Sequence, residues 1–338
     1  MATVGIVGGT GYVGAELLRL CAQHPLLDVA WATGTTGAGT RAADLYPSLA
    51  GAYPDLVFEP FTPARADGLD LVFLALPHGE SQRVVPELRA RVGKVVDLAA
   101  DFRLRDPAAY EQWYGEPHQA VAQLDDFAYG LPELFRDEIV KAEAVAAPGC
   151  YPTAAALALA PLVRAGAVVT DGVIVDAASG VSGAGRALKP TTHFGRANED
   201  FTAYGLLDHR HTPEMEQAIG AQVLFTPHLA PMTRGILATC YARPVAATST
   251  DALMAVLHDA YDDEPFVTVV DEPPSTKATY GANTAHVTVR HDPRTGWVVA
   301  LAALDNLVKG AAGQAVQCAN LVLGLEETTG LPLVAVYP

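Results

Sequence analysis

A thiol at the predicted start of a helix is the first feature of this sequence that points to chemistry. Cys150 lies in APGCYPT, directly after Gly149 and two residues before Pro152, a residue that fits the first turn of a helix. Unpaired N–H groups and the dipole at a helix N-terminus favour thiolate over thiol, and the thiolate is the nucleophile. We therefore predict a nucleophilic cysteine, with a buried packing cysteine as the alternative.

Two histidines in LDHRHTPEMEQ are candidates for the acid or base that a cysteine nucleophile needs. Thr212 and Pro213 predict a helix start with Thr212 as N-cap, so that His211 precedes the helix and Glu214 lies in its first turn. Glu214 is near enough in sequence to orient an imidazole. His209 and His211 both remain candidates, and a solvated helix start with two surface histidines is the alternative.

A glycine-rich turn lies between a predicted strand and a predicted helix in GIVGGTGYVG. Glycines let the backbone turn tightly and approach a pyrophosphate, while the helix N-terminus supplies N–H donors. The spacing is GxxGxxG, a variant of GxGxxG, and its strand–turn–helix context favours a dinucleotide site over a structural turn. The predicted cofactor ligands here are Gly8, Thr10, Gly11, Tyr12, Val13 and Gly14.

The segment after the second predicted strand distinguishes NADP from NAD. An NAD site usually has an acidic residue there that binds the ribose 2′-hydroxyl. This sequence reads ATGTTGAGTR and reaches its first acid only at Asp44. Hydroxyls and an arginine suit a 2′-phosphate, so we predict NADP(H), with a polar surface loop as the alternative. The predicted ligands are Thr33, Thr35, Thr36 and Arg41, and Pro77 and His78 are predicted to line the same crevice.

The elements that must position these residues fall into two groups. Up to residue 148, apolar runs at 2–7, 26–33, 70–79 and 93–102 alternate with helical patterns, which is typical of a Rossmann-type, doubly wound parallel sheet. From Val223 the chain is rich in strands, interrupted by a helix at 251–263, which predicts an α+β domain with a mostly antiparallel mixed sheet. Helices are also predicted at 151–166 and 309–325. Cys150 falls at the boundary of the two groups, where clefts form.

Composition excludes several function classes. Half of the 338 residues are hydrophobic and 18% are charged, which suits folded domains, and the net charge of −16 argues against nucleic-acid or anionic-membrane partners. The four cysteines lie far apart in sequence, which predicts free thiols in a reducing cytoplasm. The start of the chain lacks the basic region of a signal peptide, and no apolar run has the length of a membrane span. The histidines lack metal-ligand spacing, so no metal is predicted.

From residue 4 to about residue 325, the chain resembles the type 1 N-acetyl-γ-glutamyl-phosphate reductases, or N-acetylglutamate semialdehyde dehydrogenases, of arginine biosynthesis. The matching segments, in order, are GGTGYVGAELLRL, FLALPHG, DLAADFRL, YGLPEL, APGCYPTAA, SGVSGAGR, HRHTPE, RGILAT and LDNLVKGAAGQAVQ. Aspartate-semialdehyde and glyceraldehyde-3-phosphate dehydrogenases share the two-domain plan and the cysteine. The resemblance implies NADPH-dependent reduction of N-acetyl-γ-glutamyl phosphate to the semialdehyde through a Cys150 thioester, with phosphate release.

The resemblance also implies roles for residues and domains. It puts the catalytic histidine in HRHTPE, where we choose His211 because it lies three residues before Glu214, and His209 stays open. The domains are 1–148, which binds NADP; 149–308, for catalysis and oligomerisation; and 309–338, a helix and tail that return to the first domain. By analogy we expect a homo-oligomer, a dimer or a tetramer.

Further ligands are expected in three segments. Arg103 in DFRL is a candidate for the leaving phosphate, with a structural salt bridge as the alternative. Asn306 is predicted to bond the nicotinamide amide, or else to cap the final helix. SGVSGAGR, interpreted as a flexible loop, brings further groups toward cofactor or substrate: Ser179, Gly180, Ser182 and Gly183, with Arg186 and Lys189 as secondary anion ligands.

Other functions remain as alternatives. The same chemistry on a carrier-linked aminoadipyl phosphate of lysine synthesis, or on aspartyl phosphate, would use similar residues. A non-catalytic NADP-sensing protein would keep the fold, although the cysteine and histidine are both present. A cysteine hydrolase leaves the glycine-rich turn without a purpose.

Overall fold

The computed structural model describes residues 1–34 and 36–337, which divide into two compact units. Of the described residues, the first unit comprises 1–34, 36–148 and 311–331, and the second comprises 149–310 and 332–337. The last residues therefore group with the second unit, unlike the predicted tail. The cause is local, because Pro332 O accepts the Asn283 N–H and Val336 donates its N–H to Tyr280 O.

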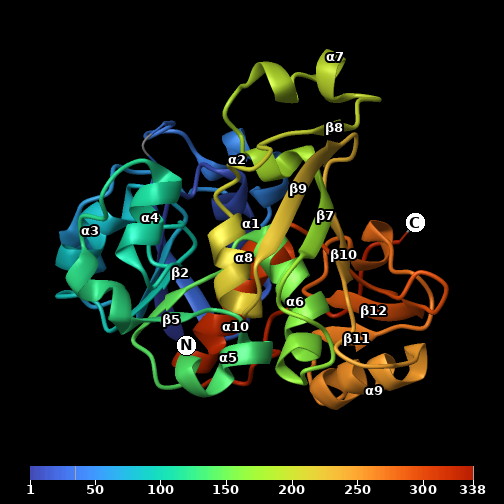
Figure 1. Cartoon of the computed structure of the whole chain (residues 1–338). Coiled ribbons are helices and arrows are strands. Elements are labelled where there is room, and N and C mark those ends of the chain that lie inside the picture. The colour runs from blue at the N-terminus through green and yellow to red at the C-terminus, as the bar shows by residue number, and fades with distance from the viewer. Residues whose placement is uncertain (35, 338) are drawn as a thin grey trace. The chain divides into compact units, whose positions relative to one another are not determined.

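The first unit is a six-stranded parallel sheet (Figure 1). Its spatial order is β2 (Leu27–Ala32), β1 (Ala2–Val7), β3 (Leu71–Leu74), β4 (Lys94–Asp97), β6 (Ala144–Ala146) and β5 (Phe127–Tyr129). Its α-helices are α1 (Tyr12–Gln23), α2 (Ala42–Leu45), α3 (Ser81–Leu88), α4 (Pro107–Tyr114), α5 (Pro132–Ile139) and α10 (Gly313–Val322). Buried valine, isoleucine and leucine side chains fill the central strands, as expected for a sheet covered on both faces. The predicted doubly wound architecture is confirmed.

Two predicted strands of this unit are shorter than the sequence suggested. β3 ends at Leu74 and β4 at Asp97, whereas strands were expected to reach residues 79 and 102. Beyond the two strand ends, Gly79 has a left-handed φ of 83° and donates its N–H to Asp101 at 2.6 Å, so the two segments meet in a turn there and do not extend the sheet. β5 and β6 were not predicted, since three residues are too few to show a period.

The second unit is a seven-stranded mixed sheet (Figure 1). Its order is β11 (Val267–Val269), β12 (Ala285–Asp292), β13 (Trp297–Leu304), β10 (Ile236–Ala242), β7 (Val173–Gly180), β9 (Val223–Ala230) and β8 (Thr202–Ala203). Two pairings, β7 with β9 and β11 with β12, are parallel, and the others are antiparallel. The expected mostly antiparallel mixed sheet is therefore confirmed.

The second unit has four α-helices in its described residues. They are α6 (Cys150–Arg164), α7 (Phe194–Ala197), α8 (Thr212–Ile219) and α9 (Thr250–Tyr261). Of these, α6, α8 and α9 pack on the sheet. α6 packs on β10 and β13, and its residues 151–162 are all buried. The small alanine side chains in this run let the helix approach the strands closely. α8 and α9 each pack beside α6. No helix in the described part of the chain has both the length and the apolar character needed to cross a bilayer.

Candidate active site

The glycine-rich turn of the first unit leads into a helix N-terminus that no side chain caps. Gly8 has a φ of 88°, and a Cβ there would lie 2.2 Å from Ala75 O, while a Cβ on Gly14 would lie 2.4 Å from Gly8 O. At Gly11, the N-cap of α1, the nearest atom to such a Cβ is Gly8 O at 3.6 Å, an ordinary van der Waals distance, and no side chain caps this helix end. Ala15 makes a helical bond to Gly11 O, and the preceding N–H groups of Tyr12, Val13 and Gly14 can therefore point at an anion.

The end of β2 lies beside this turn. Thr33 O accepts the N–H groups of Gly8 and Gly9 at 3.1 and 2.7 Å, and Thr33 is 1% exposed. Thr36 is exposed, and Thr35 lies outside the described residues. Arg41 makes a bidentate pair with Asp44 at 3.0 and 2.8 Å, which raises the pKa of the arginine. Both side chains are more than half exposed, and an ion pair in water contributes little free energy. A phosphate that binds Arg41 would therefore displace only a weak interaction with Asp44.

The loop after β3 is held by a buried acidic cluster that sequence reasoning missed. Asp101 accepts hydrogen bonds from the N–H groups of Gly79 and Gln82 and from Ser81 Oγ, and Ser81 Oγ also lies 2.9 Å from Asp97 Oδ2. Both aspartates are fully buried. Burial, and then the neighbouring Asp101, raise the pKa of Asp97 to about 7. The only sequence signal was two acidic residues in a run otherwise typical of a buried strand.

Pro77 and His78 precede this held turn, and the His78 ring lies 5.9 Å from that of Tyr114. Arg103 is 8% exposed. Its Nε donates to Ala147 O and its Nη2 to Leu98 O, both at 2.8 Å. These contacts to backbone carbonyls, together with its charge interaction with Asp97, support a structural role for Arg103.

Cys150 is the first residue of α6, as predicted, and Gly149 is the N-cap. Its side chain is partly exposed, whereas the remaining three cysteines are buried in packing positions: Cys21, Cys240 and Cys318. Burial raises the pKa of the Cys21 thiol to about 12, and it also raises the pKa of Cys240. Cys150 is therefore the thiol placed to react, at the positive end of a helix dipole.

Glu214 holds the residue before the cysteine. Its Oε1 accepts the Gly149 N–H at 2.7 Å, and the glutamate is 1% exposed. This contact joins the first turn of α8 to the N-cap of α6, and it was not predicted. The expectation that Glu214 orients an imidazole stays a prediction.

The two histidines of HRHTPE lie together near Tyr151. Their ring centroids are 4.9 Å apart, and they lie 5.7 Å (His209) and 6.0 Å (His211) from the Tyr151 ring. Tyr204 and Phe225 flank His209, and the Tyr204 hydroxyl donates to that of Tyr151. None of these three aromatic residues was predicted, because they come from separate elements.

The two imidazoles have different surroundings. His209 Nδ1 accepts the His211 N–H at 3.2 Å, so the neutral ring carries its proton on Nε2. Burial, and then the charge of Arg210, lower the pKa of His209 to about 4. His211 is the N-cap of α8. The prediction that Thr212 caps α8 is wrong, because Thr212 is its first helical residue and donates its hydroxyl back to His209 O.

The segment SGVSGAGR was expected to be a loop, but it starts with the last two residues of β7 and continues into a short helix. After β7 it forms the short 3₁₀ helix η4 (Val181–Ala184). Three backbone N–H groups, those of Gly180, Val181 and Ser182, donate to carbonyls of the β9–β10 connection. A Cβ on Gly183 would lie 2.8 Å from Ser179 Oγ, and Ser179 Oγ donates to Gly180 O. Farther along, Arg186 and Lys189 are exposed.

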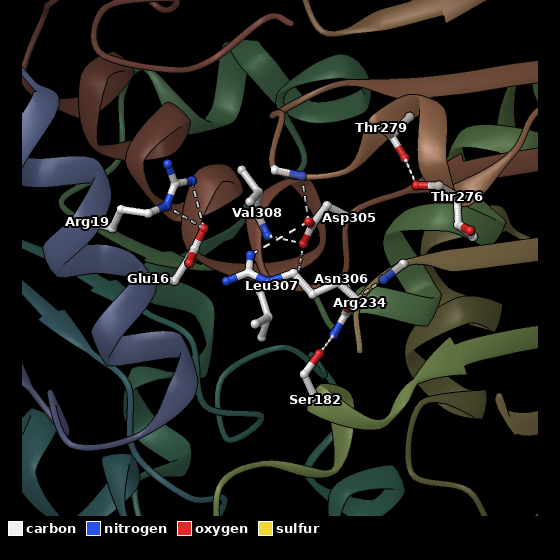
Figure 2. A network of polar contacts seen from close by, with 12 residues as sticks. Glu16, Arg19, Ser182, Arg234, Thr276, Thr279, Asp305, Asn306, Leu307 and Val308 are labelled. Carbon is white, nitrogen blue, oxygen red and sulfur yellow. Dashed lines mark hydrogen bonds and ion pairs between the residues drawn. The ribbon is translucent and has the colours of Figure 1, made fainter. Parts of the chain in front are cut away.

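Asn306 is engaged at both ends of its amide. Its Oδ1 accepts the Gly235 N–H at 2.7 Å and its Nδ2 donates to Ser182 Oγ at 2.9 Å (Figure 2). The alternative that it caps the final helix is wrong, because Asp305 Oδ1 accepts the N–H groups of Leu307 and Val308. Within the described residues, no group of three or more His, Cys, Asp or Glu side chains is arranged to hold a metal ion.

The semialdehyde dehydrogenase family models match both units. The NAD binding domain model matches residues 3–142, and the dimerisation domain model matches residues 150–306. The first unit is therefore a nicotinamide-dinucleotide domain of the NAD(P) type.

Solved structures support the same fold. Aspartate semialdehyde dehydrogenase II of Vibrio cholerae, complexed with ASA, has a TM-score of 0.72 at 17% identity and covers 96% of this chain and 98% of its own. Aspartate semialdehyde dehydrogenase with NADP from Candida albicans has a TM-score of 0.71 at 15% identity, with the same coverage. Because the identity is this low, the likeness shows the fold alone.

Curated relatives are far more similar in sequence. An N-acetyl-gamma-glutamyl-phosphate reductase of Desulforudis audaxviator is 49% identical over 100% of both chains. Those of Symbiobacterium thermophilum, at 49% over 97% of both chains, and of Pseudomonas aeruginosa, at 48% over 100% of both chains, agree with it. Together with the glycine-rich turn before α1 and the helix-borne Cys150, this similarity shows that the chain belongs to the N-acetyl-gamma-glutamyl-phosphate reductase family of semialdehyde dehydrogenases.

Proposed function

We propose that this chain catalyses the NADPH-dependent reduction of N-acetyl-γ-glutamyl phosphate to N-acetylglutamate 5-semialdehyde, with release of phosphate, in arginine biosynthesis. The observation that carries the proposal is the placement of Cys150, the partly exposed thiol at the N-terminus of α6. An acyl phosphate is a substrate for such a thiolate, since attack expels phosphate and leaves a thioester.

The residues around Cys150 supply the remaining steps. The N–H groups at the start of α6 are preorganised donors for the oxyanion that forms when the thioester is reduced. His211 protonates this oxygen and, in the reverse direction, removes the proton from the thiohemiacetal. His209 is the weaker candidate, because its lowered pKa leaves little imidazolium near neutral pH. Collapse of the thiohemiacetal then returns aldehyde and thiolate, with neutral His211 taking up the hydroxyl proton.

Three segments of the first unit bind the cofactor, which supplies hydride when bound. The N-terminus of α1 at Gly11, which no side chain caps, fits a pyrophosphate. We assign NADP(H) rather than NAD(H), with the 2′-phosphate bound by Arg41 and the nearby threonine hydroxyls. Pro77 and His78 line the same crevice.

Binding roles in the second unit follow the same assignment. Ser179, Ser182 and Asn306 bind cofactor or substrate through the ordered turn after β7. Arg103 remains the candidate ligand of the leaving phosphate, and Arg186 and Lys189 are secondary anion ligands.

Assembly and compartment complete the proposal. We assign residues 1–148 to cofactor binding and the second unit to catalysis and oligomerisation. The match of residues 150–306 to the dimerisation domain model supports a homo-oligomer, either a dimer or a tetramer. The four free thiols, one of them a nucleophile, suit a reducing compartment, so we place the enzyme in the cytoplasm.

The substrate is tested in the reverse direction with NADP and phosphate. We expect oxidation of N-acetylglutamate semialdehyde and far slower oxidation of aspartate semialdehyde or a carrier-linked aminoadipate semialdehyde. A preference for either of the latter would contradict the substrate assignment. Cys150→Ser should abolish turnover while leaving NADP binding nearly intact, and Cys21→Ser, at a buried cysteine, is the matched control. Full activity of Cys150→Ser would exclude the thioester route.

A further inference from the structure

The turn that follows β13 is held by a buried carboxylate. Asp305 is fully buried, and its Oδ1 accepts the N–H groups of Leu307 and Val308 at 2.8 and 3.1 Å (Figure 2). Its Oδ2 accepts the Gly281 N–H at 2.8 Å and lies 3.6 Å from Arg234 Nη1. Because a buried charge needs such partners, these contacts fix the path of the chain beyond β13.

The chain then makes a π-helical turn, η7 (Val308–Ala312), which brings a glycine against the cysteine. Gly310 donates its N–H to Asp305 O, five residues back, at 2.9 Å. A Cβ on Gly310 would lie 2.8 Å from Cys150 Cβ and 3.2 Å from Cys150 Cα. The same Cβ would also lie 3.2 Å from Leu304 Cδ1, and Leu304 is fully buried. The turn therefore has little room to move away from Cys150 on the side of Leu304. Single π-turns are rare and frequently occur at functional sites.

We propose that Gly310 is a positioning residue for the nucleophile, and that only a hydrogen side chain there lets Cys150 keep its place in the first turn of α6. The proposal rests on the proposed function of Cys150. Glu214 restrains the same turn through the Gly149 N–H, so contacts from two separate elements hold the backbone of the nucleophile. The contact between Gly310 and Cys150 joins residues 160 positions apart in sequence.

The test is Gly310→Ala, with Gly93→Ala as the matched control. A Cβ on Gly93 meets nothing within 4 Å, and Gly93 is exposed. Displacement of a reacting atom by about 1 Å lowers turnover roughly 100-fold, so we expect kcat of Gly310→Ala to fall by that order. The rate and pH profile of iodoacetamide alkylation of Cys150 should change as well, while the Kd for NADP stays the same. The control should stay within about twofold of the parent in each measurement, as for most surface substitutions.

A stability cycle separates this contact from the chemistry. In a Cys150→Gly background the nearest clashing atom, Cys150 Cβ, is gone, so Gly310→Ala should lower the melting temperature less than it does in the parent. If Gly310→Ala alone does not fold, recovery of folded protein in the Cys150→Gly background supports the proposal, and failure in both backgrounds refutes it. An equal melting-temperature loss in both backgrounds, or parent-like alkylation and turnover of Gly310→Ala, also refutes it. Activity of Cys150→Ser would instead refute the proposed function, while the stability cycle would still report on the contact.

Discussion

Asp97→Asn should remove a pH dependence of stability that arises inside the first unit. Asp97 is fully buried, with Ser81 Oγ and the Ala99 N–H as donors and with Asp101 close by as a like charge. Arg103 partly offsets that repulsion. The outcome is a carboxyl whose pKa rises from its usual value to about 7.

The sign and size of the effect follow from linkage. A carboxyl whose pKa is raised by folding stabilises the native state in its protonated form, and this contribution is lost as the pH rises through the folded pKa. For an unfolded pKa of about 4 and a folded pKa of about 7, the unit is more stable by roughly 2 kcal/mol at about pH 5.5 than at about pH 8. For a domain of this size that corresponds to roughly 4 to 8 °C in melting temperature.

Asparagine reproduces the protonated carboxyl. Its Oδ1 can accept the Ala99 N–H, and its Nδ2 can donate to Ser81 Oγ, which keeps its own proton for Asp101. The assay is the melting temperature of parent and Asp97→Asn across this pH range, followed by circular dichroism. We expect the difference between the two proteins to be small at about pH 5.5 and to favour the variant by several degrees at about pH 8.

Asp101→Asn is the contrasting control. Asp101 accepts from the Gly79 and Gln82 N–H groups and from the Ser81 and Tyr110 hydroxyls, so an amide NH₂ there faces donors. This variant should lose stability at every pH, because buried groups are left unsatisfied. Parallel pH curves for the parent and Asp97→Asn would refute the reasoning, since Asp97 would then titrate outside this range.

Three further substitutions test the site. Glu214→Ala removes the acceptor of the buried Gly149 N–H, so melting experiments should show a loss of roughly 1 to 3 kcal/mol in the free energy of unfolding. Alkylation of Cys150 should also slow, and unchanged alkylation would argue against a positioning role for Glu214. His211→Asn should lower kcat by roughly 10² to 10⁴ and His209→Asn by much less, as measured in kcat–pH profiles, and the reverse order would make His209 the proton carrier. Arg41→Ala should weaken binding of NADP more than that of NAD in fluorescence titrations, because only NADP carries the 2′-phosphate; equal weakening would contradict this assignment.

Local patterns in the sequence were sufficient for the long elements and for two chemical features. Apolar runs and helical periods predicted both sheets, and glycine, proline and strand–helix context predicted the turn at Gly8–Gly14 and the helix start at Cys150. These features depend on residues that are neighbours along the chain, so their physical causes can be read locally.

Tertiary structure alone decided which groups hold those features in place. Glu214 bonds Gly149 across 65 residues, Arg103 bonds Ala147 across 44, and Gly310 packs on Cys150 from a turn that Asp305 organises. No local preference of the chain specifies such contacts, because they arise when separately formed elements pack together and each buried polar group must find a partner. The sequence by itself thus determined that Cys150 begins a helix and that a glycine-rich turn joins β1 to α1, and the packing of distant segments decided how the backbone at Cys150 is held.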